Sequence, residues 1–382
     1  MEAVLLDWVN LLLRWAHVIV GIAWIGASFY FIWLDNHLEA SRDQALAGEL
    51  HAIHGGGFYR VEKYRLAPAE LPQTLHWFKW EAYWTWLTGF ALLVAVYYVN
   101  AELYLIDPAV MPLSKPMAIG IGLASLVVSL AIYEALCRSP LGRDDVLLSV
   151  ILFLLLAFAA WALTQLFSGR GAFIHYGAIL GTIMAANVAH VIIPGQRELV
   201  RAMQEGRAPE EKYAVIGKQR SVHNTYFTLP VVFTMIAGHY PMTWNWLVLV
   251  ALTLAGALVR VWFVMRHKGR APWWVLVLGI AFVVFSMILV SPVKLPQAEP
   301  VSFDDVRRII DARCVSCHAD KPTFQGMAEA PKGARLDTPE RIRAQAALIL
   351  QQTAVSRAMP PGNLTGMTEE ERALLARWAR RP

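Results

Sequence analysis

Charged residues are scarce in this chain. Only 16% of its 382 residues are charged, 57% are hydrophobic, and the mean hydropathy is +0.43. An ordinary soluble domain has about 25% charged residues, so this shortage argues against a soluble globular protein and favours a membrane protein. The formal net charge of +5 is small and unevenly distributed, and nothing in it indicates nucleic-acid binding.

Cysteine is equally scarce, with three in the chain. Three cysteines exclude a disulfide framework. Cys314 and Cys317 are followed by His318, and Cys-x-x-Cys-His is the attachment signature of a c-type haem. A zinc site or a redox pair is the alternative, and the lack of a second cysteine pair disfavours it. Cys137 ends an apolar run, where we expect a small buried side chain.

Long apolar runs, by contrast, are abundant. A hydrocarbon core of about 30 Å requires roughly 20 apolar residues in a helix. The first run follows acidic Glu2 and Asp7 rather than a basic region, which predicts a membrane helix and not a cleaved signal peptide. The sequence predicts eight spans: 9–34, 82–100, 117–137, 146–168, 173–193, 225–240, 244–265 and 273–292.

Basic residues concentrate in alternate loops. The loops 35–81, 138–145, 194–224 and 266–272 hold sixteen Lys and Arg residues, whereas the other loops hold only Lys115 and Arg170. Because cytoplasmic loops carry the excess of Lys and Arg, we expect these four loops inside and both chain ends in the periplasm. The Cys-x-x-Cys-His motif then lies outside, where bacterial haem attachment occurs.

The last 80 or so residues read as a small cytochrome c domain. Residues 303–312 predict an amphipathic helix, and Thr368 with Glu371 forms the capping box of a terminal helix. His318 is the expected iron ligand on one side, and Met359 in "RAMPPGN" is the best candidate on the other. The sequence therefore predicts an all-α protein with a membrane domain (1–292), a linker (293–300) and a periplasmic cytochrome c domain (301–382).

Several histidines lie in or beside the predicted spans, and ionisable groups there are functional candidates. An outer set suggests a second, b-type haem; its members are His17, His175 and His239. The alternative is that each histidine only bonds a neighbouring helix.

An inner set suggests a cationic pocket with aromatic walls for a flat anion. The alternative is a basic cytoplasmic loop beside an aromatic belt, without a binding site. Three glycines in "HGGGFYRVEKY" would allow close backbone approach to a ligand. The set comprises His76, Trp80, Glu81, Tyr83, Glu134, His190, Lys218, Arg220, His223 and Asn224.

Several strings, in this order, resemble the membrane-bound bacterial urate oxidases (urate hydroxylases) that carry a C-terminal cytochrome c. The resemblance covers nearly the whole chain. It is carried by "RWAHVIVGIAWIGASFYFIWLD", "HGGGFYRVEKY", "LPQTLHWFKWEAYWTWLTGF", "NVAHVIIPGQREL" and "GKQRSVHNTYFTLPVVFTMIAGHYP", followed by Cys-x-x-Cys-His and the Met359 segment.

The resemblance implies oxidation of urate with water to 5-hydroxyisourate in purine catabolism. Electrons would pass through the c haem to a periplasmic cytochrome or a terminal oxidase, without direct production of hydrogen peroxide. For this chemistry the proposed bases are His76, His190 and His223, the anion clamps Lys218 and Arg220, and the proton exits Glu81 and Glu134. Asn224, Trp80 and Tyr83 would contact the substrate. The oligomeric state stays open.

Three other readings stay open on the residues alone. The first is a quinol–cytochrome c type oxidoreductase with the same haems. The second is an anchored electron-transfer module whose partner binds the substrate. The third is a transporter with a cytochrome appendage, which the lack of detectable inverted repeats disfavours.

Overall fold

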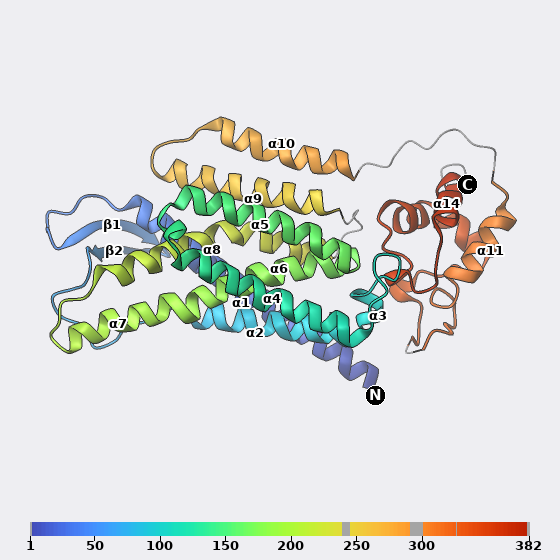
Figure 1. The fold of residues 1–382 in the computed structure, drawn as a ribbon, viewed down its shortest axis with the longest axis horizontal. Helices are drawn as coiled ribbons and strands as arrows, with labels where there is room; N and C mark the ends of the chain where they lie inside the picture. The colour runs from blue at the N-terminus through green and yellow to red at the C-terminus, as the bar shows by residue number, and fades with distance from the viewer. Residues whose placement is uncertain (1, 239–244, 291–300, 326, 380–382) are drawn as a thin grey trace.

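The computed structural model describes residues 2–238, 245–290, 301–325 and 327–379. The first two ranges form an elongated helical bundle, and the last two form a small helical unit at one end of it (Figure 1). Helices make up most of the described chain, as the sequence predicted, and a single β-hairpin is the departure from an all-α fold.

The long helices lie side by side along the length of the bundle (Figure 1). Two are continued by π-helical segments, α2 by η1 and α6 by η3, and η3 leads on into α7. Their bounds are α1 (Glu2–His37), α2 (Trp80–Leu92), η1 (Leu93–Tyr98), α4 (Lys115–Arg138), α5 (Asp145–Leu166), α6 (Gly169–Ala186), η3 (Asn187–Ile192), α7 (Ile193–Gln204), α8 (Glu211–Ala237), α9 (Trp246–His267) and α10 (Trp273–Leu289).

Five helices of the described chain are long and apolar enough to cross a membrane. They are Trp8–His37, Lys115–Arg138, Asp145–Leu166, Gly169–Gln204 and Trp246–His267. The other three predicted spans are helical too, but α2 has 13 residues, α10 has 17, and α8 carries Arg220, His223 and Asn224 within its length. The structure therefore supports membrane association, and the full set of eight spans stays a prediction.

Burial separates the centre of the bundle from its outside. In the most apolar stretch of the α6–α7 helix 61% of the residues are buried, against 17% in α1 and in α5. Most exposed side chains of α5 are apolar, as at Val146, Leu154 and Phe158, and exposed polar ones occur mainly near its ends. An apolar outer surface of this kind is suited to lipid and unsuited to water. The α6–α7 helix is thus the central helix, packed against α2, α4, α5 and α8.

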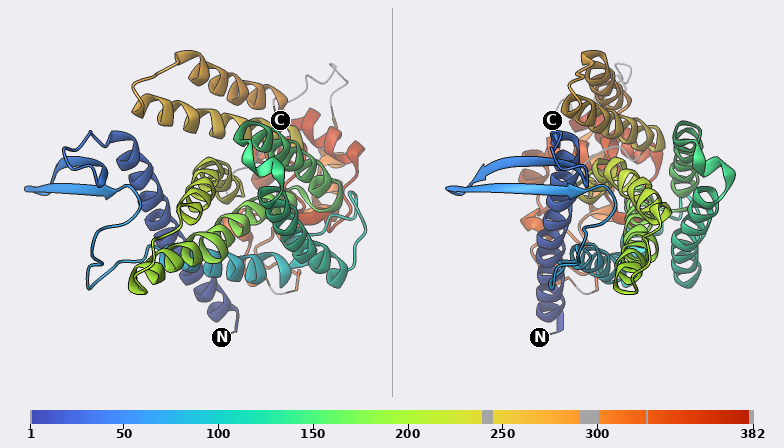
Figure 2. Two further views of the ribbon diagram at one scale, coloured as in Figure 1. Left: turned by 60° about the vertical axis from the view of Figure 1, so that its left-hand side comes forward. Right: turned by 90° about the vertical axis from the view of Figure 1, so that its left-hand side faces the viewer.

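A β-hairpin occupies part of the segment predicted as a loop. Strands β1 (Leu46–His54) and β2 (Gly57–Tyr64) pair in antiparallel register. Gly55 and Gly56 form the two-residue turn with φ of +58° and +84°, values that glycine adopts without the steric cost of other residues. The glycines predicted near a ligand therefore serve a turn, and the hairpin projects away from the helices (Figure 2).

The C-terminal unit packs its first and last helices on a shared core. These are α11 (Phe303–Arg313) and α14 (Glu369–Ala379), with α12 (Pro339–Ala344), α13 (Ala346–Ile349) and η5 (Leu350–Val355) between them. The predicted capping box is confirmed, because Glu371 N donates to Thr368 Oγ1 at 3.2 Å and Thr368 N donates to Glu371 Oε2 at 2.8 Å. The core includes Val306, Ile310, Cys314, Leu375 and Trp378.

The two parts of the chain contact each other at a short turn. The 3₁₀ turn η6 (Pro361–Asn363) lies on α3 (Ala101–Tyr104), which follows η1 at the end of the bundle opposite the hairpin (Figure 1). Gly362 makes the approach possible. A Cβ there would lie 2.6 Å from the carbonyl oxygen of Ile106 and 2.7 Å from that of Glu102.

Candidate functional site

A cavity of about 1870 Å³ opens near the hairpin end of the bundle. Typical ligand pockets measure roughly 300–1000 Å³, so a small planar molecule fits easily. The cavity is lined by residues of α5, α7, α8 and α9 and by the segment after β2. Four residues of the predicted inner set line it together: His190, Lys218, Arg220 and His223.

The π-helical segment η3 helps to form this site. It interrupts the α6–α7 helix at Asn187–Ile192, and π turns inside α-helices occur frequently at functional sites. Asn187 is fully buried and belongs to the polar network described below, whereas His190 is exposed and lines the cavity. One short segment thus supplies a buried amide to the network and an exposed imidazole to the cavity.

Tyr133 on α4 connects the polar residues behind the cavity wall. Its hydroxyl lies 2.7 Å from Nδ1 of His223 and accepts a hydrogen bond from Nδ2 of Asn187 at 2.9 Å. Asn187 also donates to Oδ1 of Asn224 at 2.8 Å, and Asn224 donates to the carbonyl oxygen of Met184. Asn224, which was predicted to contact the substrate, therefore belongs to the polar network behind the cavity wall.

These contacts fix the orientation of the His223 ring. The Tyr133 hydroxyl accepts from Asn187 and also bonds Nδ1 of His223, and its one hydrogen and two lone pairs allow either atom of the second bond to be the donor. Nδ1 is occupied in both cases, so Nε2 is the ring nitrogen left for the cavity. Because His223 lines the cavity, this nitrogen is available to a ligand. Tyr133 was missed by the sequence analysis, although it precedes Glu134, which was singled out.

Arg220 is buried and already paired. It donates to both carboxylate oxygens of Glu134, at 3.0 and 3.2 Å, and to Oδ1 of Asn187 at 3.2 Å. Glu134 in turn accepts from Arg138 at 2.9 Å. Arg220 thus orders the network, and its charge is offset before any anion arrives.

Lys218 is paired in the same way. Its ammonium contacts Asp35 at the end of α1, and Lys63 of β2 donates to the same carboxylate at 2.7 Å. This cluster ties the hairpin to α1 and α8. Both predicted anion clamps therefore lie at the cavity with carboxylate partners, which the sequence analysis did not foresee.

The residues predicted around the start of α2 lie elsewhere. Within the described residues, the cavity lining does not include His76, Trp80, Glu81 or Tyr83. His76 is exposed and its ring packs on Phe78 at 4.5 Å between centroids, while Trp80 is 58% exposed. The structure thus places this group on a separate surface.

Of the two outer histidines that the structure describes, His175 has both ring nitrogens engaged. It is fully buried; Nδ1 donates to the carbonyl oxygen of Gly171 at 2.8 Å and Nε2 lies 3.1 Å from the Tyr98 hydroxyl. His17 Nδ1 lies 3.0 Å from Oγ1 of Thr88, and His239 is outside the described residues. His175 as placed has no nitrogen left for iron, so a b haem stays a prediction.

The Cys-x-x-Cys-His segment has the features that a covalent haem needs. Cys314 and Cys317 are both free thiols, and burial raises the pKa of the Cys314 thiol to about 12. Nδ1 of His318 donates to the carbonyl oxygen of Ala334 at 2.8 Å. This bond orients the ring and leaves Nε2 for a metal, a common arrangement for metal-bound histidine. The residues present therefore fit a c haem.

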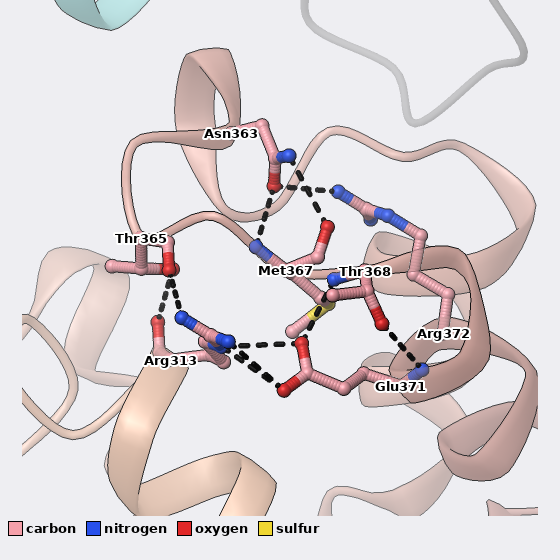
Figure 3. Close-up of polar contacts among 7 residues, drawn as sticks. All are labelled: Arg313, Asn363, Thr365, Met367, Thr368, Glu371 and Arg372. Atoms are coloured by element: carbon pink, nitrogen blue, oxygen red, sulfur yellow. Dashed lines mark hydrogen bonds and ion pairs between the residues drawn. The ribbon is translucent and has the colours of Figure 1, made fainter. Parts of the chain in front are cut away.

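Hydrogen bonds also hold the loop that carries the methionines. Arg372 donates to the carbonyl oxygen of Met359 at 2.8 Å and to Asn363 at 3.1 Å. Arg313 bonds the carboxylate of Glu371 through Nε and Nη2 (Figure 3). Met359 is partly exposed, whereas Met367 is buried in the core with Cys314. No group of three or more His, Cys, Asp or Glu suited to a metal ion occurs in the ranges that the structure covers.

Comparison with known proteins gave one result. A family model described as "Urate oxidase N-terminal" matches residues 3–291, which is more than half of the chain and includes every helix from α1 to α10. No curated protein and no solved structure matches.

Proposed function

The chain belongs to the urate oxidase N-terminal family, and from this premise we propose that it is a membrane oxidoreductase that converts urate and water to 5-hydroxyisourate. The reaction releases two electrons and two protons, and the added oxygen comes from water. The family membership supports urate as the substrate. The cavity supports the location of the site, and it is lined by His190, Lys218, Arg220 and His223.

The charge of the cavity supports an anionic substrate. Six Lys and Arg residues line it against the acids Asp145, Glu198 and Glu211. Four of the six pair with Asp35 or Glu134 just outside the lining, so the excess is one positive charge. Urate is a planar monoanion at neutral pH, and an excess of positive charge in a cleft raises the local concentration of such a substrate. Tyr226 and Phe227 supply aromatic surface for its flat face.

The two cavity histidines take different roles in this proposal. His223 presents Nε2 to the cavity because Tyr133 occupies Nδ1, and in the proposed Nε2–H tautomer it donates a hydrogen bond to a substrate oxygen. His190 is exposed and has no hydrogen-bond partner among the described residues. It is therefore the better base, and it removes the proton from the water that attacks oxidised urate.

Residues 301–382 form a cytochrome c domain in this proposal. Cys314 and Cys317 would hold the haem, His318 would ligate its iron, and Met359 is the proposed second ligand. A haem held by these residues would supply one-electron transfer to a periplasmic cytochrome or a terminal oxidase. The protein would lie in the bacterial inner membrane with both termini in the periplasm, where the linker 293–300 leads into this domain.

An anaerobic visible spectrum of the purified full-length protein tests the proposal. Urate added in excess should reduce the haem to the extent that dithionite does, and a pyridine haemochrome should identify a covalent c-type haem. Hypoxanthine, which is also a planar purine, serves as the control and should leave the spectrum unchanged. A fully loaded haem that dithionite reduces and urate does not would contradict the proposed activity, and quinols would then be tested.

A further inference from the structure

Arg260 on α9 differs from the other buried arginines. Three arginines are buried in the part of the chain that the structure describes: Arg220, Arg260 and Arg372. Arg220 bonds Glu134 and Asn187 and leaves only its Nε without a partner, and Arg372 bonds three oxygens of its own unit. Arg260 is 4% exposed, and its Nε and Nη2 atoms have no hydrogen-bond partner among the described residues.

The surroundings hold the guanidinium without offsetting its charge. Its central carbon lies 3.9 Å from the centroid of the Phe29 ring of α1. That contact is attractive but much weaker than a carboxylate pair. Removal of one partner of a buried ion pair is strongly destabilising because it leaves such an uncompensated charge. An unpartnered arginine at this depth therefore indicates a ligand that completes it.

Arg260 adjoins the proposed substrate cavity, although it is not itself among the residues that line it. Its neighbour Val261 lines that cavity, as do Thr253 and Ala257 of the same helix. Seven residues make almost two full turns of an α-helix, so Arg260 shares the helix face of Thr253. Tyr226 of α8 lines the cavity and is close enough to Arg260 for the two groups to interact electrostatically.

The unpartnered atoms form one edge of the guanidinium. Nε and Nη2 donate two parallel hydrogen bonds, the geometry that suits a planar anionic group with two acceptors. The same chain uses this edge elsewhere, because Arg313 binds the Glu371 carboxylate through Nε and Nη2 at 3.1 Å each. Arg260 offers the same edge, and the described residues provide no carboxylate for it.

We propose that Arg260 is the anion-binding residue of the substrate site and takes the N–C–O edge of a planar purine monoanion. The identity of the anion rests on the proposed function. Arg220 and Lys218 then have supporting roles, because Glu134 and Asp35 already offset their charges. The ring of Phe29 packs on the guanidinium of Arg260 and helps to hold it in place.

Binding of urate to reduced protein tests this assignment without turnover. Full-length protein is kept reduced with dithionite, so that its haem accepts no electrons, and the Kd for radiolabelled urate is measured by equilibrium dialysis. Arg260→Gln should raise the Kd at least tenfold. Arg260→Lys keeps the charge but loses the two-donor edge, so its Kd for urate should lie between those of Arg260→Gln and the wild type.

Arg266→Gln is the matched control. Arg266 lies on the same helix, is exposed and contacts the Trp262 ring, so its loss should leave the Kd within about twofold. Arg260→Gln protein that binds urate as tightly as the wild type overturns the proposal. Wild-type protein that binds no urate contradicts the proposed function, and the assignment of Arg260 falls with it.

Thermal unfolding separates a ligand-binding role from a structural one. If Arg260 is kept for a ligand, Arg260→Gln should melt at the same or a higher temperature without urate, because it removes an uncompensated charge. It should also lose the increase in Tm that urate gives the wild type. A lower Tm without urate, together with an undiminished urate-dependent increase, would overturn the proposal.

Discussion

At the scale of single residues, the contact between Tyr133 and His223 decides what the cavity can do. The Tyr133 hydroxyl bonds Nδ1 of His223 and accepts a hydrogen bond from Asn187. The imidazole is thereby held in one orientation with Nδ1 occupied. A histidine without this partner could turn either nitrogen to the cavity, and the substrate would lose a contact at a fixed position.

Tyr133→Phe tests this contact. Loss of the hydroxyl leaves buried polar atoms of His223 and Asn187 without their partner, at a cost of about 1–3 kcal/mol in the free energy of unfolding. Because the imidazole is no longer held in one orientation, kcat for urate should fall by on the order of ten- to a hundredfold. Steady-state kinetics and thermal unfolding measure the two effects.

Tyr176→Phe is the matched control for that experiment. Tyr176 is also fully buried, its hydroxyl lies 3.0 Å from Oγ1 of Thr253, and it does not line the cavity. Its loss should reduce stability in a similar way and leave kcat within about twofold. Equal losses of kcat in the two variants would show that Tyr133 acts on stability alone.

The sequence identified the reactive residues better than their partners. His190, Lys218, Arg220 and His223 were predicted together, and the cavity brings them together. The ion pair of Lys218 with Asp35 joins residues 183 positions apart, and no local pattern indicates such a pair. Arg260 was passed over for the same reason, since a missing partner becomes visible only when the neighbouring helices are known.

At the scale of elements, periodicity and apolar length predicted the helices well and the irregular segments poorly. The helix that begins at Glu211 was predicted only from 225, because its polar first half carries the site residues. The π-helical segment η3 has no known sequence signal, yet it positions Asn187 and His190. The glycine run at 55–57 was interpreted as a ligand approach, whereas it forms the turn and the start of β2 in the hairpin.

The contact between η6 and α3 gives a prediction at this scale. Gly362 has a φ of +53°, and a larger side chain would meet two backbone carbonyl oxygens that cannot move aside easily. Gly362→Val should therefore separate the C-terminal unit from the bundle and slow haem reduction by urate in stopped-flow measurements. Reduction by dithionite should be unchanged, because it needs no contact with the bundle.

Gly366→Val is the control that distinguishes the clash expected at Gly362→Val from the effect of backbone strain alone. Gly366 has a φ of +65°, so valine costs about 1–3 kcal/mol of strain there as at Gly362. The nearest atom to a Cβ at Gly366 is Nη1 of Arg313, at 3.8 Å, within the same unit. This variant should keep the wild-type rate of reduction by urate. Equal slowing in both variants would mean that strain, not docking, matters.

At the scale of the whole molecule, the distribution of charge and the arrangement of the helices predict the same orientation in the membrane. The hairpin, α7 and the connection from α9 to α10 lie at one end, and the C-terminal unit lies at the other (Figure 1). The loops of the first end hold the sixteen basic residues, and the positive-inside rule assigns such loops to the cytoplasm. The substrate cavity would then lie near the cytoplasmic face and the cytochrome in the periplasm, so that electrons cross most of the bilayer.

Labelling of single introduced cysteines tests that direction. In a background with Cys137→Ser, Gly206→Cys lies between α7 and α8, and Ala328→Cys lies in the C-terminal unit; both positions are exposed. A membrane-impermeant maleimide added to intact spheroplasts should label Ala328→Cys alone. It should label Gly206→Cys only after permeabilisation, because fixed positive charge holds that loop inside. Label on Gly206→Cys in sealed cells would place the cavity on the periplasmic side. Urate and haem would then share one face, and electrons would no longer need to cross the bilayer.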